Sequence, residues 1–167
     1  SNAGESDNST SAAIVTAPAQ VTGVASTHQT AGTIALTWAM PIATVGHEAT
    51  GYIVYWNDGY GGAQMVASQR VATTTRNATI SGLIGGREYK FVVSALNIGG
   101  EGDVSAVHTQ STAQPSISGV NSTHQTTDSI TLAWNVPAAA GGATITRYML
   151  YMDDGAGSNI TVKKYNG

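Results

Sequence analysis

The chain has 167 residues, a net charge of −3 and no cysteine. It therefore has no disulfide, no thiolate metal site and no cysteine nucleophile. The pI near 5.7 leaves no basic surface, which argues against nucleic acid or an anionic membrane as partner. Because only 10% of the residues are charged, and long runs of helix-forming residues are missing, we expect an all-β protein.

The first 17 residues are expected to precede the fold. Ser1, Asn2 and Ala3 resemble the remainder of a cleaved expression tag, so the lack of a signal peptide does not indicate a cytosolic protein. Residues 4–17 are rich in small polar side chains and have no sustained period, which predicts a flexible lead-in. We expect the ordered part to begin at Pro18.

The first two strands are expected on either side of a polar loop. Val21 and Val24 predict an edge strand, and residues 27–30 predict the loop. Residues 33–38 then alternate between apolar and polar side chains. This alternation places three large side chains on the buried face of the second strand: Ile34, Leu36 and Trp38.

A third strand is expected at residues 52–56, where both faces are largely apolar. One face carries Tyr52, Val54 and Trp56, and the other carries Ile53 and Tyr55. The Asp-Gly pair that follows supplies the positive φ of a hairpin turn. Shorter strands are expected near residues 65–71 and at residues 77–80.

Residues 89–100 carry the clearest strand pattern. Tyr89, Phe91, Val93 and Ala95 repeat with period two, and residues 97–100 then turn the chain. Leu83 stands six residues before Tyr89, a spacing suited to a chain that turns sharply beneath a buried tyrosine. Residues 102–112 predict the last strand, which runs into a linker at residues 110–114.

Past this linker the sequence repeats at an offset of 96 residues without a gap. The recurring residues include Gly23 and Gly119, His28 and His124, Trp38 and Trp134, Tyr52 and Tyr148, and Asp58 and Asp154. This is a tandem repeat. We therefore expect a lead-in at residues 1–17, a first domain at 18–112, and a linker with the first half of a second domain at 113–167.

These features together resemble the fibronectin type III family. The resemblance rests on a repeat of about 95 residues, on the tryptophan of the second strand, on the Leu83 spacing, and on the Tyr-x-Phe-x-Val-x-Ala-x-Asn-x-x-Gly pattern at residues 89–100. It covers residues 18–112 completely and 115–167 in part. One departure is Gly85, which stands where the family often has proline, and we expect it to loosen the corner before Tyr89.

The resemblance implies a seven-stranded immunoglobulin-like β-sandwich. Strands A, B and E would form one sheet, and strands C′, C, F and G the other. The second copy would supply only strands A, B, C and C′. Because two-stranded sheets are marginal in water, we expect this copy to be a fragment, which would need another chain to cover its core if it is ordered.

No group of side chains predicts catalysis. Two of the four histidines, His28 and His124, occupy the same loop position in successive repeats, and nothing resembles a nucleophile elbow or a paired-carboxylate cleft. Residues 153–158 lack the distal ligands of a calcium loop, and a hairpin turn explains them better. We expect no enzyme activity, no metal site and no cofactor.

Apolar residues also mark the outer face of the predicted C–F sheet. Ile53, Tyr55, Val92 and Leu96 point away from the core if their neighbours point inward, and Met149 and Tyr151 keep the pattern in the second repeat. Such a stripe predicts a contact surface for a protein partner. The alternative is cross-strand pairing that only stabilises the sheet.

Four Asn-x-Ser/Thr sequons occur in the chain, at Asn8, Asn77, Asn121 and Asn159. Chance alone would give roughly two in this composition. Asn77 alternates with inward-facing Ala78, so we expect it to face solvent, as a glycan requires. The candidate glycosylation sites are Asn77, Asn121 and Asn159.

The sequence therefore predicts a non-enzymatic extracellular or cell-surface module that binds or spaces, within a multi-repeat adhesion or recognition protein. An alternative from another class is a non-catalytic accessory module of a secreted hydrolase, and a third is an intracellular scaffold. We expect its partner to be a protein or a neighbouring repeat, with chain–chain association possible through the incomplete second repeat.

Overall fold

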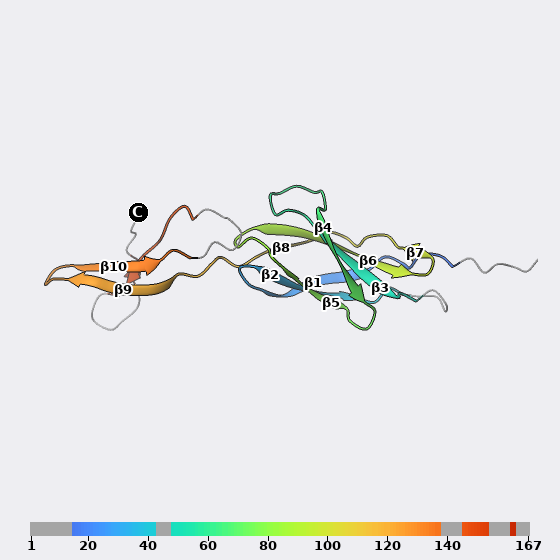
Figure 1. The fold of residues 1–167 in the computed structure, drawn as a ribbon, viewed down its shortest axis with the longest axis horizontal. Coiled ribbons are helices and arrows are strands. Elements are labelled where there is room, and N and C mark those ends of the chain that lie inside the picture. Colours follow the sequence, from blue (N-terminus) through green and yellow to red (C-terminus); the bar gives the residue numbers. More distant parts are fainter. Residues whose placement is uncertain (1–14, 43–47, 138–144, 154–160, 163–167) are drawn as a thin grey trace, which may run out of the picture.

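The computed structural model describes residues 15–42, 48–137, 145–153 and 161–162. All regular secondary structure within these ranges is β (Figure 1). The strands of the first domain are β1 (Thr22–Gln29), β2 (Thr33–Ala39), β3 (Gly51–Trp56), β4 (Ala67–Ala72), β5 (Asn77–Ser81), β6 (Glu88–Asn97), β7 (Gly100–Glu101) and β8 (His108–Ser111). Those that follow are β9 (Ser118–Gln125), β10 (Ile130–Asn135), β11 (Tyr151–Met152) and β12 (Thr161–Val162).

The first domain consists of two antiparallel sheets. Strands β1, β2 and β5 form one sheet, in that order. The other sheet has the order β4-β3-β6-β7, with β8 also paired to β6. This confirms the predicted all-β sandwich and its division into an A-B-E sheet and a C′-C-F-G sheet.

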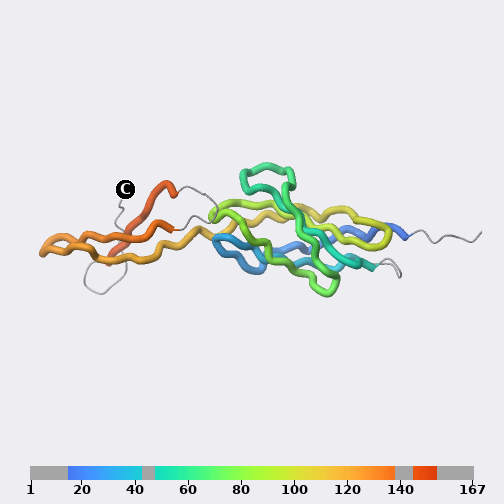
Figure 2. Tube along the Cα trace, in the orientation of Figure 1, coloured from blue at the N-terminus to red at the C-terminus, as the bar shows by residue number. Residues whose placement is uncertain are grey.

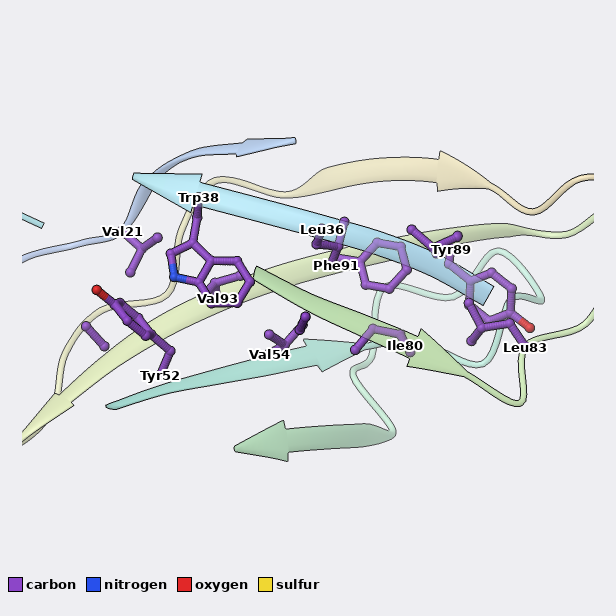
Figure 3. Packing of buried hydrophobic residues seen from close by; sticks show 13 residues of the cluster. Val21, Leu36, Trp38, Tyr52, Val54, Ile80, Leu83, Tyr89, Phe91 and Val93 are labelled. Atoms are coloured by element: carbon purple, nitrogen blue, oxygen red, sulfur yellow. The ribbon is translucent and has the colours of Figure 1, made fainter. Parts of the chain in front are cut away.

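The inner faces of the two sheets enclose a continuous apolar core (Figure 3). Trp56, which shares the inner face of β3 with Tyr52 and Val54, is partly buried and packs against this core. The other predicted inward residues of β2, β3, β5 and β6 lie in it: Ile34, Leu36, Trp38, Tyr52, Val54, Ala78, Ile80, Tyr89, Phe91, Val93 and Ala95. Near one end of this core, Trp38 and Tyr52 meet edge to face with ring centroids 5.4 Å apart. The period-two pattern therefore predicted the faces of these strands correctly.

Tyr89 fixes the corner that precedes β6. Its ring is buried beside Phe91, and its hydroxyl oxygen accepts a hydrogen bond from the Ile84 amide at 2.8 Å. Gly59, at φ +75°, lies close to the same ring, and a Cβ atom there would fall 2.7 Å from Tyr89 Cζ. The chain therefore turns around a hydroxyl that is anchored in the core.

Two local predictions are wrong. The polar loop expected at residues 27–30 begins only after Gln29, because β1 continues through two irregularities of its register with β2. Of the last strand expected at residues 102–112, only β8 is a regular strand, and the short β7 lies just before this range, at Gly100–Glu101. Between these two strands, Ser105 connects the chain to β6 in place of regular strand pairing. Its Oγ accepts a hydrogen bond from the Val93 amide at 3.0 Å, and its own amide donates to the Val93 carbonyl at 2.8 Å.

The described end of the expected lead-in contacts the first domain. Residues 15–17, which were placed before the ordered part, lie against the turn between β6 and β7, where Asn97 Nδ2 donates to the Thr16 carbonyl at 2.9 Å. This contact cannot be read from the lead-in itself, because its partner lies at the far end of the domain's sequence.

Strands β9 and β10 repeat local details of β1 and β2. Gly119 has φ +64° and its counterpart Gly23 has φ +65°. The Thr126 amide donates to the Ser129 carbonyl at 2.8 Å, as the Thr30 amide does to Thr33 at 2.9 Å. Trp134 and Tyr148 have the same 5.4 Å edge-to-face contact as Trp38 and Tyr52. These matches support the prediction that a second copy begins after the linker.

Replacing Tyr89 with Phe should destabilise the first domain by about 1–2 kcal/mol, because the half-buried Ile84 amide loses its acceptor. Urea unfolding followed by tryptophan fluorescence measures this change. Tyr60→Phe is the matched control, since Tyr60 is exposed and should change stability little. Equal stability of the two variants would show that the corner hydrogen bond contributes nothing.

Candidate binding face

The candidate site lies on the outer face of the β4-β3-β6-β7 sheet. Residues paired directly across antiparallel strands project to the same side. Tyr55 pairs with Val92, Ile53 pairs with Ser94 and Arg70, and Leu96 pairs with Glu101. The predicted residues Ile53, Tyr55, Val92 and Leu96 therefore share one face, together with Ser94, Arg70 and Glu101. We call this set the outer face.

Only part of the outer face reaches solvent. Ile53 and Val92 are each 5% exposed, although neither belongs to the core cluster, and Ser94 is fully buried. Tyr55 and Leu96 are half-buried. The predicted apolar stripe is therefore reduced in the first domain to Tyr55 and Leu96, beside the exposed side chains of Arg70 and Glu101.

Glu101 organises the polar part of the outer face. Its Oε1 accepts hydrogen bonds from the Tyr55 hydroxyl at 2.7 Å and from the Ser94 hydroxyl at 2.5 Å. Neither Ser94 nor Glu101 is among the residues predicted for this face. The alternation of β6 places Ser94 between Val92 and Leu96 and could have indicated it, whereas Glu101 requires the register across the β6–β7 turn.

These hydrogen bonds shift the pKa values of Glu101 and Tyr55 in opposite directions. The hydrogen bond from Ser94, then that from Tyr55, lowers the pKa of Glu101, and the charge of Arg70 lowers it further. Desolvation, followed by the hydrogen bond to Glu101, raises the pKa of Tyr55. At neutral pH the face therefore presents a neutral tyrosine held by an ionised carboxylate.

The two candidates in the second repeat also lie on one face. Met149 is 45% exposed and Tyr151 is 48% exposed, and the Tyr151 hydroxyl lies 3.8 Å from Met149 Sδ. Both predicted contact residues of the second repeat are therefore accessible to solvent.

Two of the candidate glycosylation sites lie in described strands. Asn77 is exposed on β5, and Asn121 is exposed on β9, where its Nδ2 donates to the Gly119 carbonyl at 3.0 Å. Asn159 and Asn8 lie outside the described residues. The exposure of Asn77 and Asn121 is compatible with a glycan.

The described residues form no cluster that suggests metal chemistry or a membrane span. No group of three or more His, Cys, Asp or Glu side chains among them could hold a metal ion. No helix within the described ranges is long and apolar enough to cross a membrane.

The family model of the fibronectin type III domain matches residues 18–111. The chain belongs to the fibronectin type III domain family. A two-domain fibronectin type III segment of chicken tenascin has a similar structure, with a TM-score of 0.65 and 18% identity, over 88% of this chain and 77% of that one. At this identity the likeness shows the fold alone.

Two longer relatives align with most of this chain. Chitinase A1 of Niallia circulans is 33% identical over 156 residues, which are 87% of this chain and 20% of the relative. The human fibronectin type-III domain-containing protein 3A is 29% identical over 145 residues, which are 80% of this chain and 11% of the relative. The chain thus spans a fifth or less of either relative.

The Glu101 network should make stability depend on pH in acid. A carboxyl whose pKa is lower in the folded state than in the unfolded chain stabilises the folded state at pH values above its unfolded pKa, which is about 4.3 for glutamate. This stabilisation is lost as the pH falls through the pKa that the carboxyl has in the folded state. Wild type should therefore exceed Glu101→Gln in urea stability at pH 7, with the difference shrinking below about pH 4.

Glu88→Gln is the matched control for this comparison of stability at two pH values. Glu88 is an exposed carboxylate on β6, the strand that pairs with the β7 strand of Glu101, and its replacement should change stability little. A difference between wild type and Glu101→Gln that is the same at both pH values would contradict the role assigned to the ionised carboxylate.

Proposed function

We propose that this chain is a non-catalytic module of a multi-repeat secreted or cell-surface protein, and that it binds a protein partner through its outer face. Membership of the fibronectin type III family supports the non-catalytic part. The site residues that would make the contact are Tyr55 and Leu96 in the first repeat and Met149 and Tyr151 in the second, with Ile53 and Val92 beneath them.

The observation that carries this proposal is the fixed position of Tyr55. Interfaces are enriched in tyrosine and arginine, and an aromatic side chain that is already ordered loses little entropy on binding. Tyr55 is half-buried, bonded to Glu101, and neighboured by Arg70. Sheet stabilisation alone explains the covered Ile53 and Val92, but does not require a tyrosine held in one orientation at the surface.

The binding face can be tested with a photoreactive residue. The chain carrying benzoylphenylalanine at Leu96 should cross-link a discrete protein from the native secreted or surface fraction, and Tyr55→Ser should abolish that product. The control probe replaces Ala35, whose β2 position faces outward from the opposite sheet. Identical products from both probe positions, or a product unaffected by Tyr55→Ser, would contradict the binding face.

A second candidate function is an accessory module of a secreted hydrolase. The specific observation in its favour is the 33% identity to a chitinase over 87% of the chain. The adjoining gene sequence separates the candidates, because a catalytic domain favours the accessory role whereas a membrane anchor and further repeats favour adhesion. Glycans on Asn77 or Asn121 in native material would exclude an intracellular scaffold.

The inner face of the second repeat offers a further partner surface. Ile130 is 66% exposed, whereas its counterpart Ile34 in the first repeat is completely buried. Val120 is 56% exposed, whereas its counterpart Val24 is partly buried against the core of the first domain. A second copy of the chain presents an equivalent apolar face, so two copies could cover each other.

Light scattering should therefore show concentration-dependent dimers of the wild-type chain, with Ile130→Asp shifting the equilibrium to monomer. Ile42→Asp is the matched control, because Ile42 is an exposed isoleucine of the first repeat and should not alter association. A monomer whose amides at residues 129–152 are protected from exchange would contradict pairing between copies.

A further inference from the structure

The chain leaves the first domain as one continuous segment that leads to β9 (Figure 2). Backbone hydrogen bonds hold this segment to the first domain. The Thr112 amide donates to the Arg87 carbonyl at 2.9 Å, and the Gly86 amide donates to the Ala113 carbonyl at 3.1 Å. On the other side, the Ala113 amide donates to the Thr30 carbonyl at 2.9 Å. The linker is therefore bonded both to the corner before β6 and to the loop after β1.

The Thr112 side chain strengthens the same attachment. It is 5% exposed, its hydroxyl donates to the Ile84 carbonyl at 2.6 Å, and its oxygen accepts from the Arg87 amide at 3.1 Å. Both hydrogen-bonding capacities of a buried hydroxyl are thus used. A linker that served only as a flexible connector would not need a buried, fully bonded threonine.

Two adjacent glycines leave room for the linker. A Cβ atom at Gly85 would lie 3.0 Å from the Ala31 carbonyl oxygen and 3.0 Å from Pro115 Cγ. A Cβ atom at Gly86, which has φ +72°, would lie 2.7 Å from Gln114 Nε2. Gly85 was expected only to loosen the corner, but its position against Pro115 gives it a packing role. We call Gly85 and Gly86 the outgoing seat.

The opposite end of the domain holds the incoming chain in a similar way. Residues 15–18 cross the β6–β7 turn, where a Cβ atom on Gly99 would collide with the Val15 carbonyl and one on Gly102 with the Pro18 carbonyl. The Asn97 side chain donates to the Thr16 carbonyl, and Gln20 Nε2 donates to the Val104 carbonyl at 2.7 Å. We call Gly99 and Gly102 the incoming seat.

We propose that these two glycine seats are interaction surfaces for the module's own flanking segments, and that they fix the directions in which the chain arrives and leaves. Domains joined by a short unbound linker move relative to one another. A linker bonded on both sides restricts this motion, so successive modules keep a defined angle. The proposal deepens the spacer part of the proposed function and does not depend on the outer face, whose test is separate.

The outgoing seat can be tested by a distance measurement between repeats. Because the chain has no cysteine, spin labels can be placed uniquely at Ser68→Cys on β4 and Ser122→Cys on β9, both exposed. Pulsed dipolar spectroscopy should give one narrow distance distribution for the otherwise wild-type chain. Gly85→Ala should broaden it about twofold or more, towards the range of a free linker, because its added Cβ meets a backbone carbonyl and a proline ring. Gly86→Ala meets the movable end of the Gln114 side chain and should broaden it less.

Matched controls separate linker contact from backbone strain. Gly61→Ala has the positive φ of Gly86 without a neighbour within 4 Å, and Gly62→Ala likewise lacks a neighbour, so both should leave the distribution narrow. If Gly86→Ala unfolds the domain, the outgoing seat is tested with Gly85→Ala and Thr112→Val instead. Neither of these positions has a positive φ, so the substitutions add no backbone strain of that kind. A broad wild-type distribution, or seat variants as narrow as the controls, would overturn the outgoing seat.

The incoming seat has its own measurement. The heteronuclear NOE of the Thr16 amide should be high in the wild-type chain and should fall in Gly99→Ala. Gly100→Ala is the control, because this neighbouring glycine, at φ +120°, has nothing within 4 Å of its added Cβ. A low wild-type NOE, or equal falls in both variants, would overturn the incoming seat.

Discussion

The hydrogen bond between the Ile84 amide and the Tyr89 hydroxyl connects the core of this module to its surface. The tyrosine ring packs in the core, so its oxygen has a fixed position from which it holds the corner at residues 84–87. That corner in turn offers the backbone groups of Ile84, Gly86 and Arg87 to the linker. Core packing therefore determines where the chain leaves the domain.

Strands β3 and β6 are covered on both faces. Their inner residues fill the core, and on the outer side Ile53, Val92 and Ser94 are nearly inaccessible. The surface that a partner would meet consists of the longer side chains of Tyr55, Arg70, Leu96 and Glu101. Such a surface is shallow and polar at its edge, so specificity would depend on the orientation of a few side chains more than on the shape of a groove.

Alternation in the sequence predicted the buried faces of β2, β5 and β6, since period two translates directly into sidedness. It could not predict that β1 would continue to Gln29, because a bulged strand tolerates polar residues that resemble a loop. Contacts set by tertiary register were also missed: Glu101 meets Tyr55 across the sheet, and Gly85 meets Pro115 across the linker. Neither partner is marked by a local pattern.

The bonded linker has a mechanical consequence. Tension applied through the chain would reach the hydrogen bonds of Gly86 and Ala113 before it reached β8. Breaking them would release a few residues, each adding about 3.3–3.6 Å of extension, while the sandwich stayed folded. With no disulfide to bear the load, the module would yield first at its joint, and the joint could reform when the tension ceased.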